Sequence, residues 1–222
     1  MNLDEINEKY NKMQEIYGAK ELDSIHCGGC INNPNICFVF MNPTKRNIAS
    51  SKSWHGIKYP WIGTKNIWDL FYKINLLDEK IYREIKEIKG PSWEESFANK
   101  VYDNVIENNY CITNLGKCAQ LDARSLPDKV LKEYLDLLFK EIEIINPKII
   151  ITFGNQVSSI VLNEKISVSQ VRKKLFKIKI NNKEYKVYPV YYPVGNGRFN
   201  IDKAIEDINW IIKKEFNIIE VN

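Results

Sequence analysis

Apolar residues recur along the chain in two patterns, a helical spacing and short continuous runs. Between residues 2 and 17 they recur every three or four positions, which predicts an amphipathic helix. The same spacing predicts helices over residues 66–76, 126–145, 156–162 and 201–216. The longest of these has Pro127 near its start, where the first turn of a helix tolerates proline.

Buried strands are predicted between these helices. Continuous apolar runs cover residues 36–41, 110–115 and 148–154, and the first and third end at turn-forming residues. Residues 174–180 alternate polar and apolar side chains, and after a turn at Asn181 residues 185–192 return as a strand. Alternating strands and helices predict a three-layer α/β/α sandwich with a short, mostly parallel central sheet.

The chain reads as one domain over residues 1–222, because no repeat, low-complexity tract or long linker interrupts the pattern. Residues 1–25 form its N-terminal helical extension. No apolar run approaches the roughly 20 residues that cross a bilayer, and residues 1–10 lack a signal-peptide core. We therefore expect a cytoplasmic monomer without membrane contact. The net charge of +4 is compatible with a polyanionic partner.

Ligands of parallel α/β sheets bind beyond the carboxyl ends of the strands, which selects the loops after residues 41, 115, 154 and 192. The first loop holds hydroxyls, amides and cations that suit phosphate contacts, although solvated loops have the same composition. Asn114 offers a donor and an acceptor to a base edge, or caps the sheet. In the last loop, glycines allow close approach and Arg198 can meet a phosphate, with a plain turn as the alternative.

The segment before the second predicted helix carries Tyr59 and Trp61, which either anchor the core or stack on a flat base. Motifs of several common chemistries are absent from the sequence. It has no Walker phosphate loop, no G-x-G-x-x-G after the first strand and no G-x-S-x-G elbow. The sequence also has only two histidines. These absences weaken the interpretation of the chain as a nucleotide triphosphatase, a dehydrogenase, a hydrolase or a His-rich zinc enzyme.

Five cysteines, an odd number, argue against a disulfide framework in a chain without a secretion signal. Cys37 and Cys111 fall inside apolar runs, where a free thiol acts as a small core residue. Cys27 and Cys30 have the spacing of a metal or cluster turn. One such pair supplies two of the usual four ligands.

Six segments, in order, resemble motifs of the uracil-DNA glycosylase superfamily over roughly residues 36–208. Residues 40–44, Phe-Met-Asn-Pro-Thr, resemble the G-M-N-P-G loop of its single-strand-selective and mismatch-specific branches. Residues 113–118, Thr-Asn-Leu-Gly-Lys-Cys, resemble T-N-V-V-K-C of the iron–sulfur branch. The other segments are residues 59–63 (P-F-V-G in the iron–sulfur branch), 67–77 (a helix of the mismatch branch), 147–154 (P-K-V-I-V-A-L-G) and 192–195 (the H-P-S loop).

This resemblance implies a monofunctional glycosylase that flips a uracil or related deaminated base out of DNA and hydrolyses its N-glycosidic bond. Asn42 would orient the attacking water, and Tyr192, in place of the family's histidine, would stabilise charge on the base. Trp61 would stack on the base and Asn114 would bind its edge. The remaining implied residues are Met41 in the base pocket and Lys45, Ser51, Gly195, Asn196 and Arg198 against DNA.

Departures from the family pattern define the alternatives. Phe40 and Thr44 replace two glycines, and Tyr192 and Val194 replace the histidine and serine of the last motif. A catalytically weak or inactive nucleic-acid-binding relative is therefore the main alternative, and a nucleoside hydrolase or other α/β enzyme is a third reading.

The resemblance also bears on a cofactor. Cys27, Cys30 and Cys118 fall where three of the four ligands of the iron–sulfur branch lie, and Tyr134 occupies the fourth position. An iron–sulfur cluster or a zinc ion at the three cysteines is one expectation, and a protein without a cofactor is the other.

Overall fold

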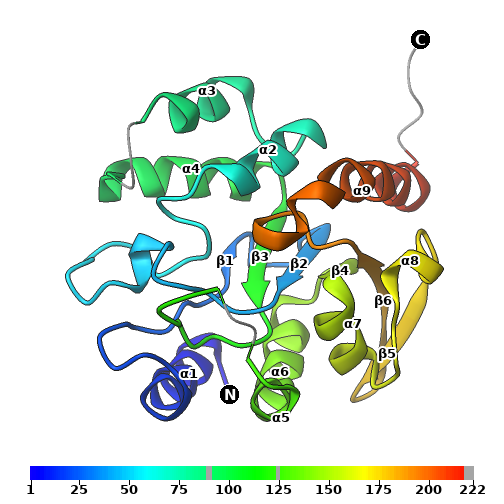
Figure 1. Ribbon diagram of the computed structural model, residues 1–222. Helices are drawn as coiled ribbons and strands as arrows, with labels where there is room; N and C mark the ends of the chain where they lie inside the picture. Colours follow the sequence, from blue (N-terminus) through cyan, green and yellow to red (C-terminus); the bar gives the residue numbers. More distant parts are fainter. Residues whose placement is uncertain (89–91, 124–125, 218–222) are drawn as a thin grey trace.

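Six strands form one central sheet in the part of the chain that the computed structural model describes, residues 1–88, 92–123 and 126–217 (Figure 1). The strand order is β1-β3-β2-β4-β6-β5. Four strands are parallel to one another: β2 (Ile36–Phe40), β3 (Tyr110–Asn114), β4 (Ile149–Phe153) and β6 (Lys183–Val190). Antiparallel strands form both edges, β1 (Gly28–Gly29) and β5 (Phe176–Ile180).

Helices cover both faces of this sheet, so the predicted three-layer α/β/α architecture is confirmed. One face packs against α2 (Asn66–Lys73), α3 (Glu79–Glu87), α4 (Glu95–Glu107) and α9 (Ile201–Phe216). The other face packs against α1 (Leu3–Tyr17), α5 (Asp128–Glu133), α6 (Leu135–Ile145) and α7 (Gly154–Leu162). Shorter elements are η1 (Ile48–Ser50), α8 (Val168–Val171) and η2 (Gly195–Asn200). None of the helices described here has the length and apolar character to cross a bilayer.

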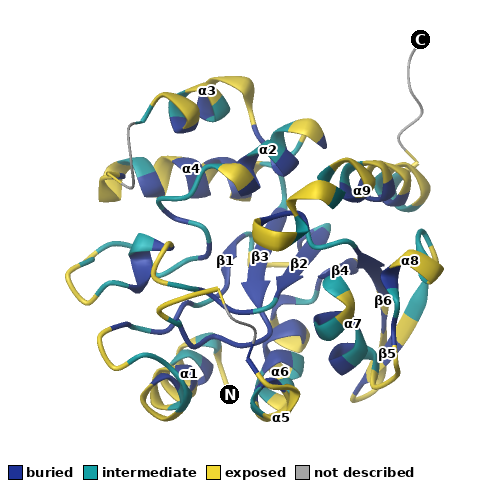
Figure 2. Cartoon of the chain, in the orientation of Figure 1, coloured by how far each residue is buried: buried dark blue, intermediate teal, exposed yellow. Residues whose placement is uncertain are grey.

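Alternating side chains along the buried strands divide the core into two layers. In β2, Phe38 and Phe40 belong to the layer under α2, α4 and α9, whereas Cys37 and Val39 belong to the layer over α1, α6 and α7. Every residue of β2, β3 and β4 is buried, as Figure 2 shows in dark blue. Continuous apolar runs are what a parallel sheet covered on both faces requires.

The helix predicted over residues 126–145 is wrong as a single element, because it breaks at Tyr134 into α5 and α6. The Tyr134 amide donates to the Leu131 carbonyl, one residue tighter than an α-helical bond. Its ring packs against Tyr10 and Tyr17 of α1, with centroids 6.1 and 6.2 Å away. Tertiary packing of this buried ring therefore accompanies the break, and no sequence spacing signals it.

Two further differences concern element boundaries and coverage. Pro127 precedes α5 instead of lying in its first turn, and the last parallel strand ends at Val190, before Tyr192. Two helices, α3 and α4, form between residues 77 and 109, where the sequence pattern predicted no helix or strand. Both helices cover the sheet face that lies beneath α2 and α9.

A buried ion pair joins the loop after β3 to α6. Lys117 Nζ lies 2.9 Å from Glu141 Oε1, and the two side chains are 0% and 1% exposed. The Thr113 hydroxyl of β3 donates to the same carboxylate oxygen at 2.6 Å. The Lys117 ammonium also lies 4.9 Å from the centre of the Tyr10 ring of α1. Lys117 and Glu141 thus connect the loop after β3 with α6 and α1, next to the end of β3.

Replacing Lys117 by methionine should lower the free energy of unfolding by about 3–5 kcal/mol, because Glu141 would stay buried without its cation. Urea denaturation of Lys117→Met and wild type measures the loss. The double variant Lys117→Met/Glu141→Met removes both charges and should be more stable than the single variant. Equal stability of the two variants would show that the buried carboxylate is not what destabilises the single one.

Candidate functional site

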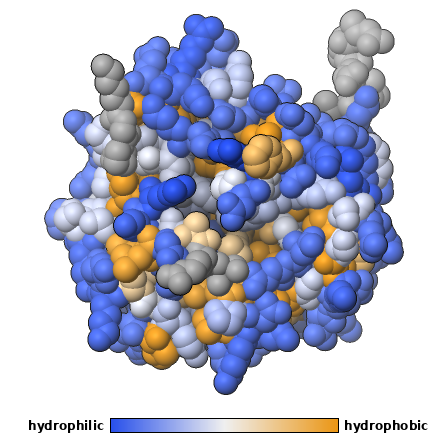
Figure 3. Space-filling model, viewed as in Figure 1, coloured by the Kyte–Doolittle hydropathy of each residue, from blue (hydrophilic) through white to orange (hydrophobic). Residues whose placement is uncertain are grey.

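A cleft of about 1590 Å³ opens at the carboxyl ends of the parallel strands. Four segments line it: residues 41–48 after β2, 60–67 leading into α2, the loop after β3, and 192–197 after β6. In Figure 3, hydrophilic residues surround the middle of this face and apolar ones lie between them. The cleft lies where the sequence pattern predicted ligands to bind.

Parallel pairing of β2 with β3 brings two asparagines together at this cleft. Phe40 pairs with Asn114, and the ladder continues past both strands through the Leu115 and Gly116 amides, which donate to the Phe40 and Met41 carbonyls at 2.8 Å. Asn42 follows directly. Met41, Asn42 and Asn114 all line the cleft.

Both asparagines present a buried oxygen with no hydrogen-bond partner in the described part of the chain. Asn42 is 8% exposed, and its Nδ2 donates to the Pro43 carbonyl at 3.1 Å, which leaves Oδ1 unpaired. Asn114 is 3% exposed, and its Oδ1 is also unpaired. Buried acceptors without a partner are rare in native proteins and indicate a ligand or water that completes them.

Trp61 enters the cleft from a left-handed backbone conformation, with φ +65°. The Thr64 hydroxyl and amide donate to its carbonyl at 2.7 and 3.1 Å and hold this turn in place. The indole Nε1 is buried without a partner among the described residues. A bulky residue in the left-handed region costs about 1–2 kcal/mol, and such strain concentrates at functional sites.

Phe40, the residue that replaces a family glycine, lies fully buried beneath the cleft. Its ring stacks on Phe153 at 4.2 Å and meets Trp61 and Tyr192 edge-on, with centroids 5.0 and 6.2 Å away. Phe40 therefore supports two side chains of the cleft from below, instead of facing outward where it would restrict the approach of DNA.

Tyr192 lines the cleft, and burial raises the pKa of its phenol to about 12. The group therefore keeps its proton at neutral pH and can donate a hydrogen bond. Its position depends on Gly197, because a Cβ at that residue would lie 2.1 Å from the Tyr192 carbonyl oxygen. Gly197 thus allows a close backbone approach within the protein itself.

Cations predominate among the charged lining residues that the structure describes: Lys45, Arg46 and Lys65 against Asp122. Of the predicted DNA contacts, Lys45, Gly195 and Asn196 line the cleft, whereas two others do not. The Ser51 hydroxyl pairs with that of Ser53 at 2.8 Å, and the Arg198 guanidinium lies 4.9 Å from the centre of the Phe199 ring.

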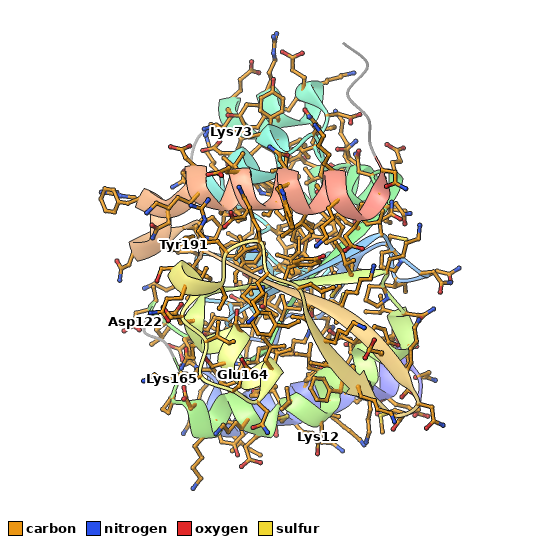
Figure 4. All side chains as sticks on the ribbon, turned by 90° about the vertical axis from the view of Figure 1, so that its right-hand side faces the viewer. Lys12, Lys73, Asp122, Glu164, Lys165 and Tyr191 are labelled. Atoms are coloured by element: carbon orange, nitrogen blue, oxygen red, sulfur yellow. The ribbon has the colours of Figure 1, made fainter. Side chains whose placement is uncertain are left out.

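Arg46, Lys65 and Asp122 were not assigned a role from the sequence. Arg46 and Lys65 lie in the two segments that sequence analysis singled out, so their charge was a usable signal. Asp122 lies in the loop after residue 115, which was selected from the strand pattern, but its residue type suggested no contact with a polyanion. Figure 4 shows Asp122 on the same side of the molecule as Tyr191, the neighbour of Tyr192.

The three cysteines proposed as metal ligands are not brought together. The thiol of Cys111 lies against those of Cys27 and Cys37 inside the core, and the Cys30 thiol donates to Asn109 Oδ1 at 3.2 Å. Cys118 lies beside Tyr134, at the position of the fourth ligand. Across residues 1–88, 92–123 and 126–217, no group of three His, Cys, Asp or Glu side chains could hold a metal ion. A cluster or zinc site stays a prediction: visible absorption of freshly purified protein tests for the cluster, and metal analysis of the same preparation tests for zinc.

One comparison with known proteins identifies a family. The model described as the uracil DNA glycosylase superfamily matches residues 28–209, which include every residue predicted here to bind the base or DNA. The helix α1 and Cys27 precede this range. No curated protein matches the chain significantly.

The left-handed conformation of Trp61 should reverse the usual ranking of alanine and glycine. Both Trp61→Ala and Trp61→Gly lose the indole contacts, but only alanine keeps a Cβ that resists positive φ. Trp61→Gly should therefore be the more stable variant by about 1 kcal/mol, although glycine elsewhere costs about 0.5–1 kcal/mol relative to alanine. Urea denaturation compares the two, and a more stable alanine variant would contradict the strained turn.

Proposed function

Because the chain belongs to the uracil DNA glycosylase superfamily, we propose that it hydrolyses the N-glycosidic bond of uracil or a related deaminated base in DNA. The observation that carries this proposal is the convergence of three buried, unpaired polar atoms on one cleft with a cationic margin. These atoms are Asn42 Oδ1, Asn114 Oδ1 and Trp61 Nε1, unpaired within the described part of the chain.

Deaminated bases suit an amide at the bottom of the cleft. Uracil and hypoxanthine carry an N–H beside a carbonyl, whereas cytosine and adenine carry a ring nitrogen acceptor beside an amino group. The Asn114 oxygen accepts from the N–H of the flipped base, and its NH₂ group donates to the adjacent carbonyl. The exposed part of the Trp61 ring packs against the base, since aromatic faces bind any π-system.

Asn42 orients the water that attacks the sugar. Its Oδ1 accepts a hydrogen bond from the water and turns an oxygen lone pair toward C1′. The C1′–N bond breaks, the base leaves with the electron pair, and the water oxygen bonds to C1′. A neutral amide does not take the proton, which passes to the departing base or to solvent.

Tyr192 acts on the departing base. Its phenol is protonated at neutral pH, and burial raises its pKa further, to about 12. The phenol donates to a base oxygen on which negative charge develops. No lysine is assigned as a nucleophile, so the products are the free base and an intact strand with an abasic site. A cation at Lys45, Arg46 or Lys65 meets the phosphates of the bound strand.

Incubation with single- and double-stranded oligonucleotides that carry uracil, hypoxanthine or xanthine, followed by alkali and gel electrophoresis, tests the proposal. Alkali-labile breaks at the modified position are expected, with no break before alkali. Binding without breaks would indicate an inactive nucleic-acid-binding relative. Neither binding nor breaks would indicate an α/β enzyme with another substrate.

Asn42→Ala should lower kcat by about 100-fold with little change in KM, because water orientation contributes on the scale of general acid–base groups. Trp61→Ala should instead weaken binding of the uracil-containing strand by about 10-fold, the scale of one stacking contact. Single-turnover rates and fluorescence anisotropy separate the two effects. Asn32→Ala, at an exposed loop residue, is the matched control, and full activity of both cleft variants would refute the assigned roles.

Lys45→Ala should weaken binding of single strands and reduce the slope of log K against log salt by about 0.7, the loss of one phosphate contact. Lys12→Ala is the control, since it removes the same charge from the exposed surface of α1, away from Asp122 at the cleft (Figure 4). Equal slopes for both variants would mean that Lys45 contacts no phosphate.

A further inference from the structure

The N-terminal helix is hydrogen-bonded to the loop that follows β3. Gln14 of α1 is 5% exposed, and its Oε1 accepts from the Ala119 amide at 2.7 Å. Its Nε2 donates to the Ala19 and Ala119 carbonyls at 2.9 and 3.3 Å. One side-chain amide thus pairs with both backbone groups of Ala119, in the manner of a neighbouring strand.

The next residue of the loop carries this connection to the segment after β2. The Gln120 amide donates to the Pro43 carbonyl at 3.1 Å, and the Lys45 amide donates to the Gln120 carbonyl at 2.9 Å. The Gln120 side chain turns back and donates to the Tyr17 carbonyl of α1 at 2.7 Å. Gln120 is therefore held by the helix on one side and holds residues 43–45 on the other.

The series of hydrogen bonds from Gln14 through Ala119 and Gln120 reaches the cleft at the Pro43 carbonyl. This carbonyl accepts both the Gln120 amide and Asn42 Nδ2, the latter at 3.1 Å. The bond from Nδ2 fixes which end of the Asn42 amide is its free acceptor. A shift of the Pro43 carbonyl would therefore turn Asn42 Oδ1 away from its place in the cleft.

We infer that Gln14 is a positioning residue for the reaction: through Ala119 and Gln120 it holds the Pro43 carbonyl, and through that carbonyl it orients the Asn42 amide. This inference rests on the proposed function for its catalytic consequence, and on geometry alone for the connection itself. Gln14 lies outside the residues 28–209 that match the family. The connection is therefore made from outside the part of the chain that matches the family.

Gly18 provides a second way to disturb the same contact. A Cβ at Gly18 would lie 2.0 Å from Gln14 Nε2, so alanine there displaces the Gln14 amide. The backbone of Gly18 has φ −92°, a conformation that alanine adopts without strain. Gly18→Ala therefore tests the position of the Gln14 side chain while leaving its chemistry unchanged.

The activity test compares Gln14→Met and Gly18→Ala with Ile6→Ala. Ile6 is a fully buried residue of α1 whose truncation loosens the helix without touching the Gln14 hydrogen bonds. At a temperature where all variants are folded, the first two should lower kcat for uracil excision by about 10-fold, since small misplacements of a catalytic group are costly. KM should stay within about twofold, and Ile6→Ala should keep wild-type kcat. Equal losses in all three would overturn the inference.

A double-mutant cycle separates positioning from general damage. If Gln14 acts through Asn42, Gln14→Met should cause no further loss of kcat in the Asn42→Ala background. A further loss of about 10-fold, equal to that seen in the wild-type background, would show that Gln14 acts independently of Asn42.

Hydrogen exchange tests the connection without any activity measurement. The Gln120 and Lys45 amides should exchange at least about fivefold faster in Gln14→Met and Gly18→Ala than in Ile6→Ala, because only the first two release the loop. Unchanged exchange would overturn the connection itself. If wild type excises no base but these amides respond as expected, the proposed function fails and the connection stands.

Discussion

The parallel pairing of β2 with β3 and β4 is the constraint on which the rest of the structure depends. Because the three strands point the same way and Phe40 pairs with Asn114, their carboxyl ends meet at one edge of the sheet. Asn42 and Asn114, 72 residues apart in the chain, must then open into the same cleft. The crossover helices that parallel pairing requires also cover both faces, which leaves this edge as the natural place for a ligand.

Several features of the cleft lower the stability of the fold, and packing of the surrounding core compensates for that loss. Trp61 has a left-handed backbone, and buried oxygens of Asn42 and Asn114 lack partners in the described part of the chain. Below them, Phe40 stacks on Phe153 and supports the aromatic rings of the cleft. Behind the end of β3, the buried pair of Lys117 and Glu141 fixes the loop that Asn114 begins. Tight packing around a site that is itself incompletely bonded is the usual arrangement of functional sites.

The sequence predicted those features of the fold that depend on local interactions, namely the buried strands and the turns that end them. The apolar runs of β2, β3 and β4 and the asparagines at the ends of β2 and β3 were visible, because burial and strand termination leave a mark on the sequence itself. The break at Tyr134 was not, since it depends on packing against Tyr10 of α1. Nor was the conformation of Trp61, which local propensity disfavours.

The cysteine thiols face directions that follow from strand pairing and that spacing alone does not reveal. The turn from Cys27 to Cys30 has the spacing of a ligand pair, yet the strand pairing of β1 with β3 decides which way each thiol faces. The thiol of Cys27 meets that of Cys111 within the core, and the Cys30 thiol points to Asn109. In the same way, Ser51 and Arg198 had suitable chemistry for phosphate contacts, but neither is among the residues that line the cleft. Side-chain direction is a tertiary property that residue type alone does not carry.

In the proposed reaction, side-chain direction also decides how Asn42 and Tyr192 would act. Asn42 is a neutral amide, and the phenol of Tyr192 is neutral at physiological pH, with a pKa that burial raises to about 12. Under the proposed function, neither group would bring a full charge to the sugar or to the departing base, so their contribution would depend on placement rather than on charge. A site of this kind is sensitive to whatever holds its amide in place. The path from Gln14 through Gln120 to the Pro43 carbonyl therefore matters more in this chain than it would beside a charged catalytic group.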